Sequence, residues 1–231
     1  MDHFKNIYTR RAADYHPLIA VEDVDGHLPS ALRRVTAFSG QRVLDLGTGT
    51  GRLPLLLARE AAQFIGLDLH WDMLRQNTVE RKRAGGRWAL LNGDMRFLPF
   101  ASAAFDVVTA GWAIGHLTGW QPDDWRQHIG AVLRAMQRVT RPGGTLIIME
   151  TLTTGSLTPA PPSHGLAEYY RWLEADWGFA RQEIRTDYQF ASVAEAVAHT
   201  EFFFGPELSQ KIRLNGWARL PEWTGVWSKT T

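Results

Sequence analysis

Short apolar runs alternate with longer amphipathic stretches over the first two thirds of the chain. Five such runs, each bounded by Gly, Asp or Asn, lie at 41–47, 63–69, 87–94, 105–113 and 144–152. Runs of this length and composition are typical of buried parallel strands.

The stretches between these runs have helical periodicity. Apolar residues recur at helical spacing from Trp125 to Val139, which predicts an amphipathic helix that "RPGG" at 141–144 terminates. Alternating strands and helices predict right-handed crossovers and a doubly wound α/β sheet that binds its ligand at the carboxyl ends of the strands.

The last third of the chain has a different pattern. Apolar positions over 166–177 predict another helix, and alternation over 184–190 predicts a strand. The final stretch, 215–230, carries three tryptophans and predicts one more strand, with Pro221 and Gly225 as a bulge or edge feature.

Composition restricts the class of protein. The chain has 231 residues, of which 45% are hydrophobic, so it fits one globular domain. Its 25 Lys and Arg nearly balance 24 Asp and Glu, which gives no strong field to attract nucleic acid or an anionic membrane. The basic cluster at 80–87 has no interleaved aromatics, so we expect a solvated helix end.

Other classes are excluded by what the sequence lacks. No apolar run is long enough to span a bilayer, and charges interrupt the first residues where a signal peptide needs an apolar region, so we expect a cytoplasmic protein without membrane insertion. The absence of Cys excludes disulfides, thiolate nucleophiles and Cys-ligated zinc. The histidines lack the i, i+4 pairing or acidic companions of a metal-binding helix, so we expect no metal.

The stretch "VLDLGTGTGR" at 43–52 carries the clearest chemical signal. Gly47, Gly49 and Gly51 follow a buried strand directly, and such a turn lets a ligand approach the backbone closely. A phosphate-binding loop needs Gly-Lys-Ser/Thr at its end, and a dinucleotide fingerprint needs glycine where Arg52 stands. The remaining pattern is G-x-G-x-G, with Asp45 two residues upstream.

This pattern resembles the first motif of class I S-adenosylmethionine (SAM) dependent methyltransferases. Four further segments are similar to later motifs of that family and follow in the same order: "GLDLHWDML", "NGDMRFLPF", "FDVVTAGWAIGHL" and "VTRPGGTLIIME". The segment "IYTRRAADYHPLIA" is similar to the lead-in helix of small-molecule methyltransferases of the ubiquinone-biosynthesis and arsenite-methylating type. Without Cys, however, the thiolate chemistry of arsenite methylation is not available.

The resemblance implies a fold and an organisation. It implies a single Rossmann-like domain over 1–231, with a mostly parallel seven-stranded sheet whose last strand is antiparallel. Within it, residues 1–40 would form a helical cap, 41–152 the SAM-binding core, and 153–231 a substrate-side insertion with the C-terminal strands. The implied reaction is in-line methyl transfer from SAM to a small-molecule acceptor, with S-adenosylhomocysteine as product.

The resemblance also implies a set of cofactor-binding residues. By analogy, Asp68 takes both ribose hydroxyls, Asp94 faces the adenine amino group, and the Met95 amide faces a ring nitrogen. The other residues of this set are Asp45, Gly47, Thr48, Gly49, Gly51, Leu69, Met73, Gly111 and Trp112. Two of the acids have structural alternatives, since Asp68 could cap the helix predicted over 71–83 and Asp94 could be a turn residue.

Aromatic and histidine side chains mark the expected substrate side. The candidates are Tyr8, Tyr15, His16, Trp112 and Tyr169. An aromatic wall suits a small, partly apolar acceptor, although core packing explains many such residues equally well. His116 follows the fourth predicted strand and is the candidate general base, with a capping or site-lining role as the alternative. An NAD-type oxidoreductase and a SAM-binding protein without transferase activity are the competing functions.

Overall fold

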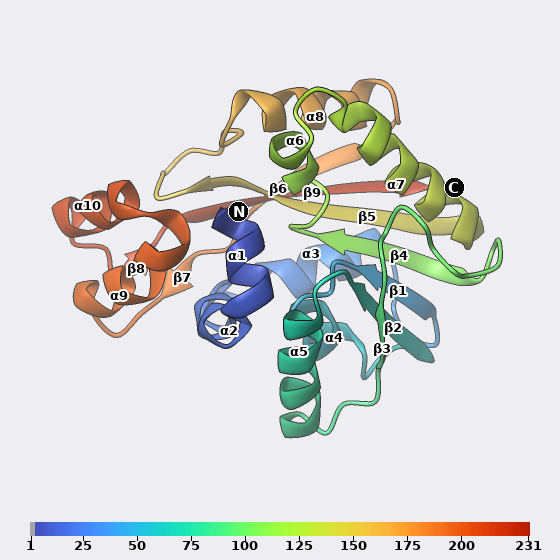
Figure 1. Ribbon diagram of the computed structural model, residues 1–231, viewed down its shortest axis with the longest axis horizontal. Coiled ribbons are helices and arrows are strands. Elements are labelled where there is room, and N and C mark those ends of the chain that lie inside the picture. Colours follow the sequence, from blue (N-terminus) through green and yellow to red (C-terminus); the bar gives the residue numbers. More distant parts are fainter. Residues whose placement is uncertain (1–2) are drawn as a thin grey trace.

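The computed structural model describes residues 3–231, which form helices packed on both faces of one sheet (Figure 1). The helices are α1 His3–Arg10, α2 Ala12–Ala20, α3 His27–Val35, α4 Arg52–Leu57, α5 Trp71–Arg83, α6 His116–Trp120, α7 Trp125–Val139, α8 His164–Ala175, α9 Val193–Phe204 and α10 Pro206–Asn215. The strands are β1 Arg42–Leu46, β2 Gln63–Asp68, β3 Ala89–Asn92, β4 Phe105–Gly111, β5 Thr140–Thr154, β6 Ala180–Arg185, β7 Tyr188–Gln189, β8 Arg219–Leu220 and β9 Glu222–Thr230.

The main sheet has seven strands in the order β3-β2-β1-β4-β5-β9-β6. Strands β1 to β5 pair in parallel, whereas β9 is antiparallel to both of its neighbours, β5 and β6. The chain therefore confirms the predicted mostly parallel seven-stranded sheet with an antiparallel last strand. The order reverses on the two sides of β1, and that switch point is where doubly wound sheets bind ligands.

Apolar side chains explain why the helices take these places. One core cluster joins α7 and α8 to one face of the sheet, with Ile129, Leu133 and Trp227 buried in it. A second cluster joins α3 and α4 to the other face through Leu32 and Leu57. The predicted helices over 71–83 and 125–139 are confirmed by α5 and α7.

Two predictions about the C-terminal third are wrong. The expected strand over 184–190 is divided, because the chain leaves β6 after Arg185 and β7 pairs with β8 in a separate two-stranded sheet. For Pro221 and Gly225, the edge alternative is wrong, since Gly225 of β9 pairs with Glu150 on one side and Glu183 on the other. The bulge alternative is not contradicted, because the β5–β9 register shifts where Thr224 and Trp223 pair with Thr151 and Thr153. Gly225 is needed for close packing, because a Cβ there would lie 2.4 Å from the Trp227 ring.

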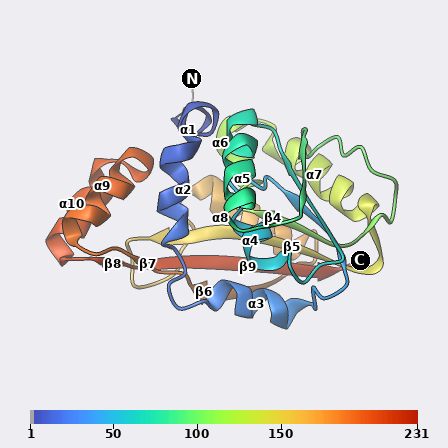
Figure 2. The same ribbon diagram turned by 90° about the horizontal axis from the view of Figure 1, so that it is seen from below.

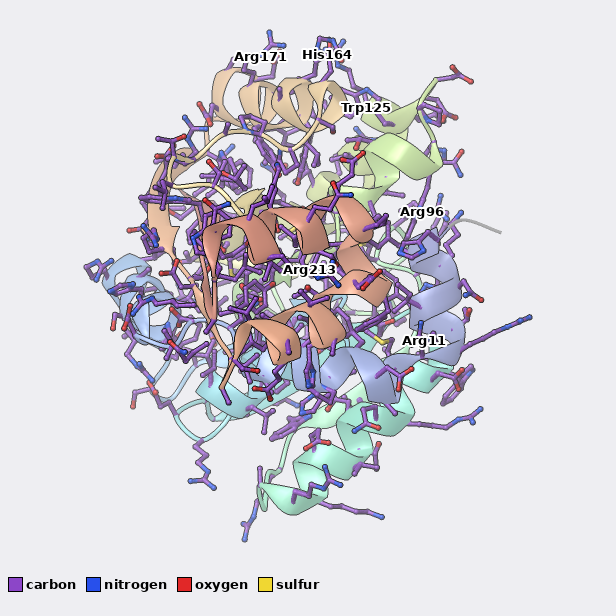
Figure 3. The ribbon with its side chains drawn as sticks, turned by 90° about the vertical axis from the view of Figure 1, so that its left-hand side faces the viewer. Arg11, Arg96, Trp125, His164, Arg171 and Arg213 are labelled. Atoms are coloured by element: carbon purple, nitrogen blue, oxygen red, sulfur yellow. The ribbon has the colours of Figure 1, made fainter. Side chains whose placement is uncertain are left out.

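Two helical layers, one of α1 and α2 and the other of α9 and α10, lie over the carboxyl ends of the parallel strands. Figure 2 shows α9 and α10 side by side at one end of the molecule, next to α1 and α2. These layers meet at aromatic residues, among them Tyr15 against Phe203. Figure 3 looks at the molecule from this side, and its Arg11 label marks the region where that guanidinium lies 4.7 Å from the Phe202 ring.

Within residues 3–231, no helix is both long enough and apolar enough to cross a bilayer.

Candidate functional site

The glycine turn lies where β1 ends. Gly47, Gly49 and Gly51 all have positive φ, at 68°, 54° and 106°. A Cβ at Gly47 would lie 2.4 Å from the Cβ of Ala113, so this position also needs a bare backbone for steric reasons. The sequence therefore uses glycine here both for backbone conformation and for close approach.

Asp68, at the end of β2, holds this turn from the neighbouring strand. Its carboxylate accepts from the Gly49 amide at 2.9 Å and from the His70 amide at 2.8 Å. Burial raises the pKa of Asp68, and these amides oppose the rise. The N-cap residue of α5 is His70, so the alternative that Asp68 caps this helix is wrong. Asp68 lies two residues earlier and links the start of α5 to the glycine turn.

Asp45 and Thr48 lie below the turn. Asp45 is buried, and the Thr109 hydroxyl donates to it at 2.7 Å. Burial raises the pKa of Asp45 to about 7 despite that hydrogen bond. The Thr48 side chain is buried against β2, where a Cβ at Gly66 would lie 2.6 Å from its Oγ1, and its hydroxyl also opposes the rise in the pKa of Asp45.

Asp94 is engaged with a neighbour. It accepts from the Arg96 amide at 2.9 Å and from the Arg96 guanidinium at 2.6 Å, while the same guanidinium contacts His128 at 2.8 Å. Burial acts to raise the pKa of Asp94, but the bonds from Arg96 outweigh it and the pKa is lowered. The predicted turn role is thus visible, and an adenine amino group would have to share the carboxylate with Arg96.

The remaining residues of the predicted cofactor set surround the turn. The Met73 Cε would lie 3.4 Å from a Cβ at Gly49, and the Met95 Cε 3.8 Å from a Cβ at Gly47. Gly111 ends β4, and Trp112 follows it with a φ of 50°. Leu69, just after β2, is exposed.

Helices α1 and α2 bring three predicted substrate-side residues to the same region. The Tyr8 hydroxyl lies 2.9 Å from Nε2 of His116, and the Tyr8 ring packs edge-on against Tyr15. His116 also stacks on Trp120, with ring centroids 5.0 Å apart. His16 Nδ1 lies 2.9 Å from the Thr50 hydroxyl, within the glycine turn.

Tyr169 does not join this group. It is fully buried on α8, where its ring packs against Tyr170 and Trp125 in the core below the helix. Its hydroxyl has no partner among residues 3–231. Tyr169 is therefore a core residue, which is the alternative given above for the aromatic candidates.

A buried charged cluster beside the turn was missed by the sequence reasoning. Arg52 Nη1 donates to Glu22 at 2.7 Å, and its guanidinium lies 4.0 Å from the Trp112 ring centroid. Glu222, at the start of β9, is also buried and interacts electrostatically with both. The available signal was a charged Arg52 in the first turn of an otherwise apolar helix, "RLPLLL".

Similarity to known proteins agrees with this geometry. Residues 43–144 match a family described as a methyltransferase domain. Demethylmenaquinone methyltransferase of Thermobifida fusca is 30% identical over 187 residues, which cover 80% of this chain and 72% of that protein. The chain belongs to the class I SAM-dependent methyltransferases. Within them it is of the ubiquinone-biosynthesis-like type.

One further relative and one solved structure are also similar to this methyltransferase. Malonyl-[acyl-carrier protein] O-methyltransferase of Legionella pneumophila is 33% identical over 144 residues, covering 61% of this chain but 46% of that protein. The crystal structure of a SAM-dependent methyltransferase from Aquifex aeolicus aligns with a TM-score of 0.58 at 15% identity, over 99% of this chain and 98% of that one. That likeness shows a shared fold.

In the described part of the methyltransferase, no group of three or more His, Cys, Asp or Glu side chains is arranged to hold a metal ion.

Proposed function

We propose that this methyltransferase acts on a small organic acceptor, held between the glycine turn and His116 at the carboxyl edge of the sheet. The observation that carries the proposal is the turn itself, in which three positive-φ glycines lie between buried Asp45 and Asp68 at the switch point of the sheet. SAM supplies an electrophilic methyl group on a sulfonium, so the protein must chiefly bind and orient the two reactants.

The cofactor side would be formed by the residues that surround the turn. The bare backbone of the three positive-φ glycines supports a ligand at this place. Asp68 retains lone pairs for ribose hydroxyls while it holds Gly49. The full proposed set is Asp45, Gly47, Thr48, Gly49, Gly51, Asp68, Leu69, Met73, Asp94, Met95, Gly111 and Trp112.

The acceptor side would be formed by Tyr8, Tyr15, His16 and Trp112. Tyr8 contacts His116 directly and Tyr15 packs on Tyr8, whereas His16 contacts Thr50 of the turn and Trp112 follows β4 beside Arg52. Aromatic faces of this kind suit a small, partly apolar molecule. The two curated relatives are named for different acceptors, a quinone and a carrier-bound malonyl group, so their names do not select one.

His116 is the proposed general base. An imidazole titrates near neutral pH and can accept a proton from a hydroxyl or amine as the methyl group arrives. The Tyr8 hydroxyl, 2.9 Å from Nε2, would fix the tautomer and the direction of the ring. The alternative is that His116 lines the site without transferring a proton. The kcat of His116→Ala distinguishes these two roles.

We retain two further predictions. The division into a cap over 1–40, a SAM-binding core over 41–152 and a substrate side over 153–231 remains a prediction from the resemblance. The cytoplasmic location remains a prediction from the sequence.

Calorimetry with S-adenosylhomocysteine and with NADH tests the function. We expect binding of S-adenosylhomocysteine and none of NADH, because no third phosphate-binding glycine stands at position 52. Turnover of methyl-labelled SAM is then measured across a panel of small acceptors. Binding of NADH alone would refute the proposal, and SAM binding with no turnover across the panel would favour a non-catalytic binding protein.

A further inference from the structure

Three charged residues far apart in the sequence share one buried place. Glu22 follows α2, Arg52 begins α4 and Glu222 begins β9. The side chains of Glu22 and Arg52 are 4% and 14% exposed, and Glu222 is 1% exposed. Groups of this kind are rarely buried unless they are paired.

The cluster is incompletely paired. Arg52 Nη1 binds Glu22 Oε2, but Arg52 Nη2, Glu22 Oε1 and Glu222 Oε2 have no partner in hydrogen-bond geometry among residues 3–231. The hydroxyls beside the two carboxyls are those of Tyr188 at Glu22 and of Thr151 and Thr154 at Glu222, and they lower the two pKa values by less than burial raises them. More than nine tenths of buried polar groups in proteins have a partner. Three unpaired atoms in one cluster therefore point to a ligand that completes them.

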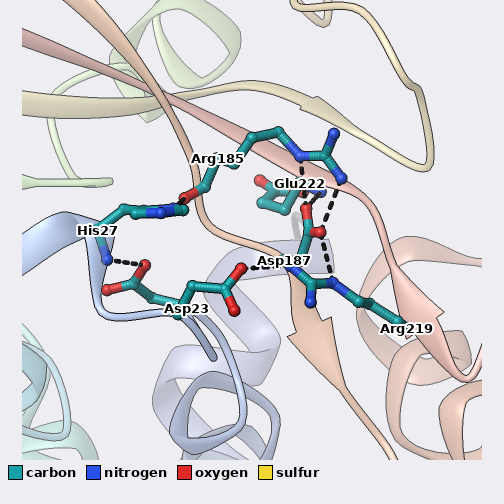
Figure 4. Close-up of polar contacts among 7 residues, drawn as sticks. Asp23, His27, Arg185, Asp187, Arg219 and Glu222 are labelled. Carbon is teal, nitrogen blue, oxygen red and sulfur yellow. Dashed lines mark hydrogen bonds and ion pairs between the residues drawn. The ribbon is translucent and has the colours of Figure 1, made fainter.

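The neighbouring arginines do not balance the negative charge of Glu222, because both already bind Asp187. Figure 4 shows Asp187 between Arg185 and Arg219, which donate to it at 2.7 and 2.8 Å, while the Glu222 amide donates to the same carboxylate at 3.1 Å. Asp23, also drawn there, accepts from the His27 amide.

The unmatched charge of the cluster is negative. Glu22 and Glu222 face a single guanidinium, that of Arg52. The other titratable neighbours, Asp23 and the phenols of Tyr15 and Tyr188, bring no positive charge. Burial, followed by the charge of Glu22, raises the pKa of Glu222 well above its usual value. A bound cation would reverse this effect by stabilising the ionised carboxylate.

The position of the cluster connects it with the acceptor. Glu222 pairs with Thr154 at the carboxyl end of β5, and the Arg52 guanidinium lies over Trp112 at the end of β4. The segment shared with the methyltransferase family is 43–144, so Glu22 and Glu222 lie outside it. A site for the common cofactor has to lie largely within the shared segment, whereas a site for this chain's own acceptor does not.

We propose that Glu22, Arg52 and Glu222 form a specificity site that binds a protonated amine of the methyl acceptor. The two free carboxylate oxygens would accept from the ammonium, and Arg52 Nη2 would donate to an oxygen next to it. This inference rests on the proposed function, because it assumes that a small molecule binds beside the glycine turn.

Matched ligands test the site. The probes are arylalkyl amines, each with the alcohol and the carboxylate of the same skeleton, such as phenethylamine, 2-phenylethanol and phenylacetate. Binding is measured by thermal shift and calorimetry, with and without S-adenosylhomocysteine. We expect the amines to bind roughly tenfold or more tightly than their alcohols, because charged hydrogen bonds are the stronger ones.

Two variants and one control locate the effect. Glu22→Gln and Glu222→Gln should each lower amine affinity roughly tenfold and leave alcohol affinity nearly unchanged. Glu60→Gln removes a carboxylate of a surface ion pair with Arg33 and should leave both affinities unchanged. Amines that bind no better than alcohols, or variants that bind amines as the parent does, would overturn the site.

The amino-acid end of SAM also carries an ammonium, so the cofactor needs its own comparison. S-adenosylhomocysteine has that end and methylthioadenosine lacks it. If the cluster bound that ammonium group, Glu22→Gln and Glu222→Gln would lower the affinity for S-adenosylhomocysteine but not for methylthioadenosine. That result would refute an acceptor site. If the parent fails to bind S-adenosylhomocysteine, the proposed function fails, while the ranking of amines against alcohols without cofactor still decides this inference.

Discussion

The glycine turn and the Glu22–Arg52–Glu222 cluster lie side by side but are built differently. The turn is completed from the adjacent strand, since Asp68 at the end of β2 binds the amides of Gly49 and His70. The cluster joins residues 22, 52 and 222, and three of its polar atoms have no partner in the described chain. The cofactor side is thus completed by two neighbouring strands of the sheet, whereas the proposed acceptor side depends on contacts between the two ends of the chain and on a ligand.

Gly47→Ala is expected to have the largest effect on the turn. Its φ of 68° strains any residue with a Cβ by about 1–2 kcal/mol, and the contact with Ala113 adds an overpacking term of about 1–3 kcal/mol. We expect the free energy of unfolding to fall by roughly 2–5 kcal/mol, with loss of S-adenosylhomocysteine binding. Urea denaturation and calorimetry measure the two.

Gly85→Ala is the matched control for this substitution. Gly85 has a φ of 61°, but a Cβ there would meet no atom within 4 Å. It should show the backbone strain alone and keep full affinity for the cofactor product. Equal losses of stability in the two variants would mean that the Ala113 contact relaxes and that the turn is less tightly packed than the structure indicates.

His116→Ala is expected to have the next largest effect and tests the boundary between the two regions. If His116 is the base, kcat falls by roughly 10²-fold or more while the affinity for S-adenosylhomocysteine stays nearly constant. Tyr8→Phe keeps the ring and removes the bond to Nε2, so it should give a smaller decrease. His199→Ala, on α9, is the histidine control. Unchanged kcat at saturating acceptor would leave orientation as the source of the rate, with His16 as the next residue to test.

The difference between the turn and the cluster shows which parts of the fold could be predicted from the sequence. The parallel half follows from local pattern, because each apolar run from 41 to 152 forms a strand and each glycine of the turn has the backbone that its type favours. The inserted position of β9 could not be predicted, since the pairing of Gly225 with both Glu150 and Glu183 depends on long-range contacts.

The same limit applies to the site. Asp45 and the glycines were found because a short segment places them together, and Asp68 was found through the resemblance to the methyltransferase family. Helical spacing made Tyr169 a candidate but could not show that its ring faces the core. Glu22 and Glu222 carry no local signal, because their meaning arises only when the end of α2 and the start of β9 approach Arg52.

Asp68→Asn is expected to have a moderate effect. It keeps the size of the side chain but replaces one acceptor oxygen by an amide donor, so either Gly49 or His70 loses its bond. We expect the affinity for S-adenosylhomocysteine to fall by roughly 1–3 kcal/mol, with a smaller loss of stability. Asp72→Asn, on the first turn of α5, is the nearby control. Parent-like affinity would remove Asp68 from the proposed ribose contact.

The smallest expected effect concerns Glu150, which links the two regions because it accepts from the Gly115 amide at 2.8 Å, just before His116. Burial raises its pKa from 4.5 to about 8, against that hydrogen bond. Between these two values the folded chain binds more protons than the unfolded chain, so the free energy of unfolding falls as the pH rises from about 5 to 8.

Glu150→Gln removes this titration and should flatten the fall by on the order of 1 kcal/mol when both proteins are unfolded in urea across this range. Asp45, whose pKa is raised to about 7, contributes a slope of the same sign in both proteins and cancels in the comparison. Asp106→Asn is the opposite control: bonds from Arg42 hold the pKa of Asp106 low, so its stabilisation is already complete at pH 5 and the variant should be uniformly less stable. If parent and Glu150→Gln show parallel curves, Glu150 is solvated in the folded protein and the turn before His116 is more open than its buried carboxylate indicates.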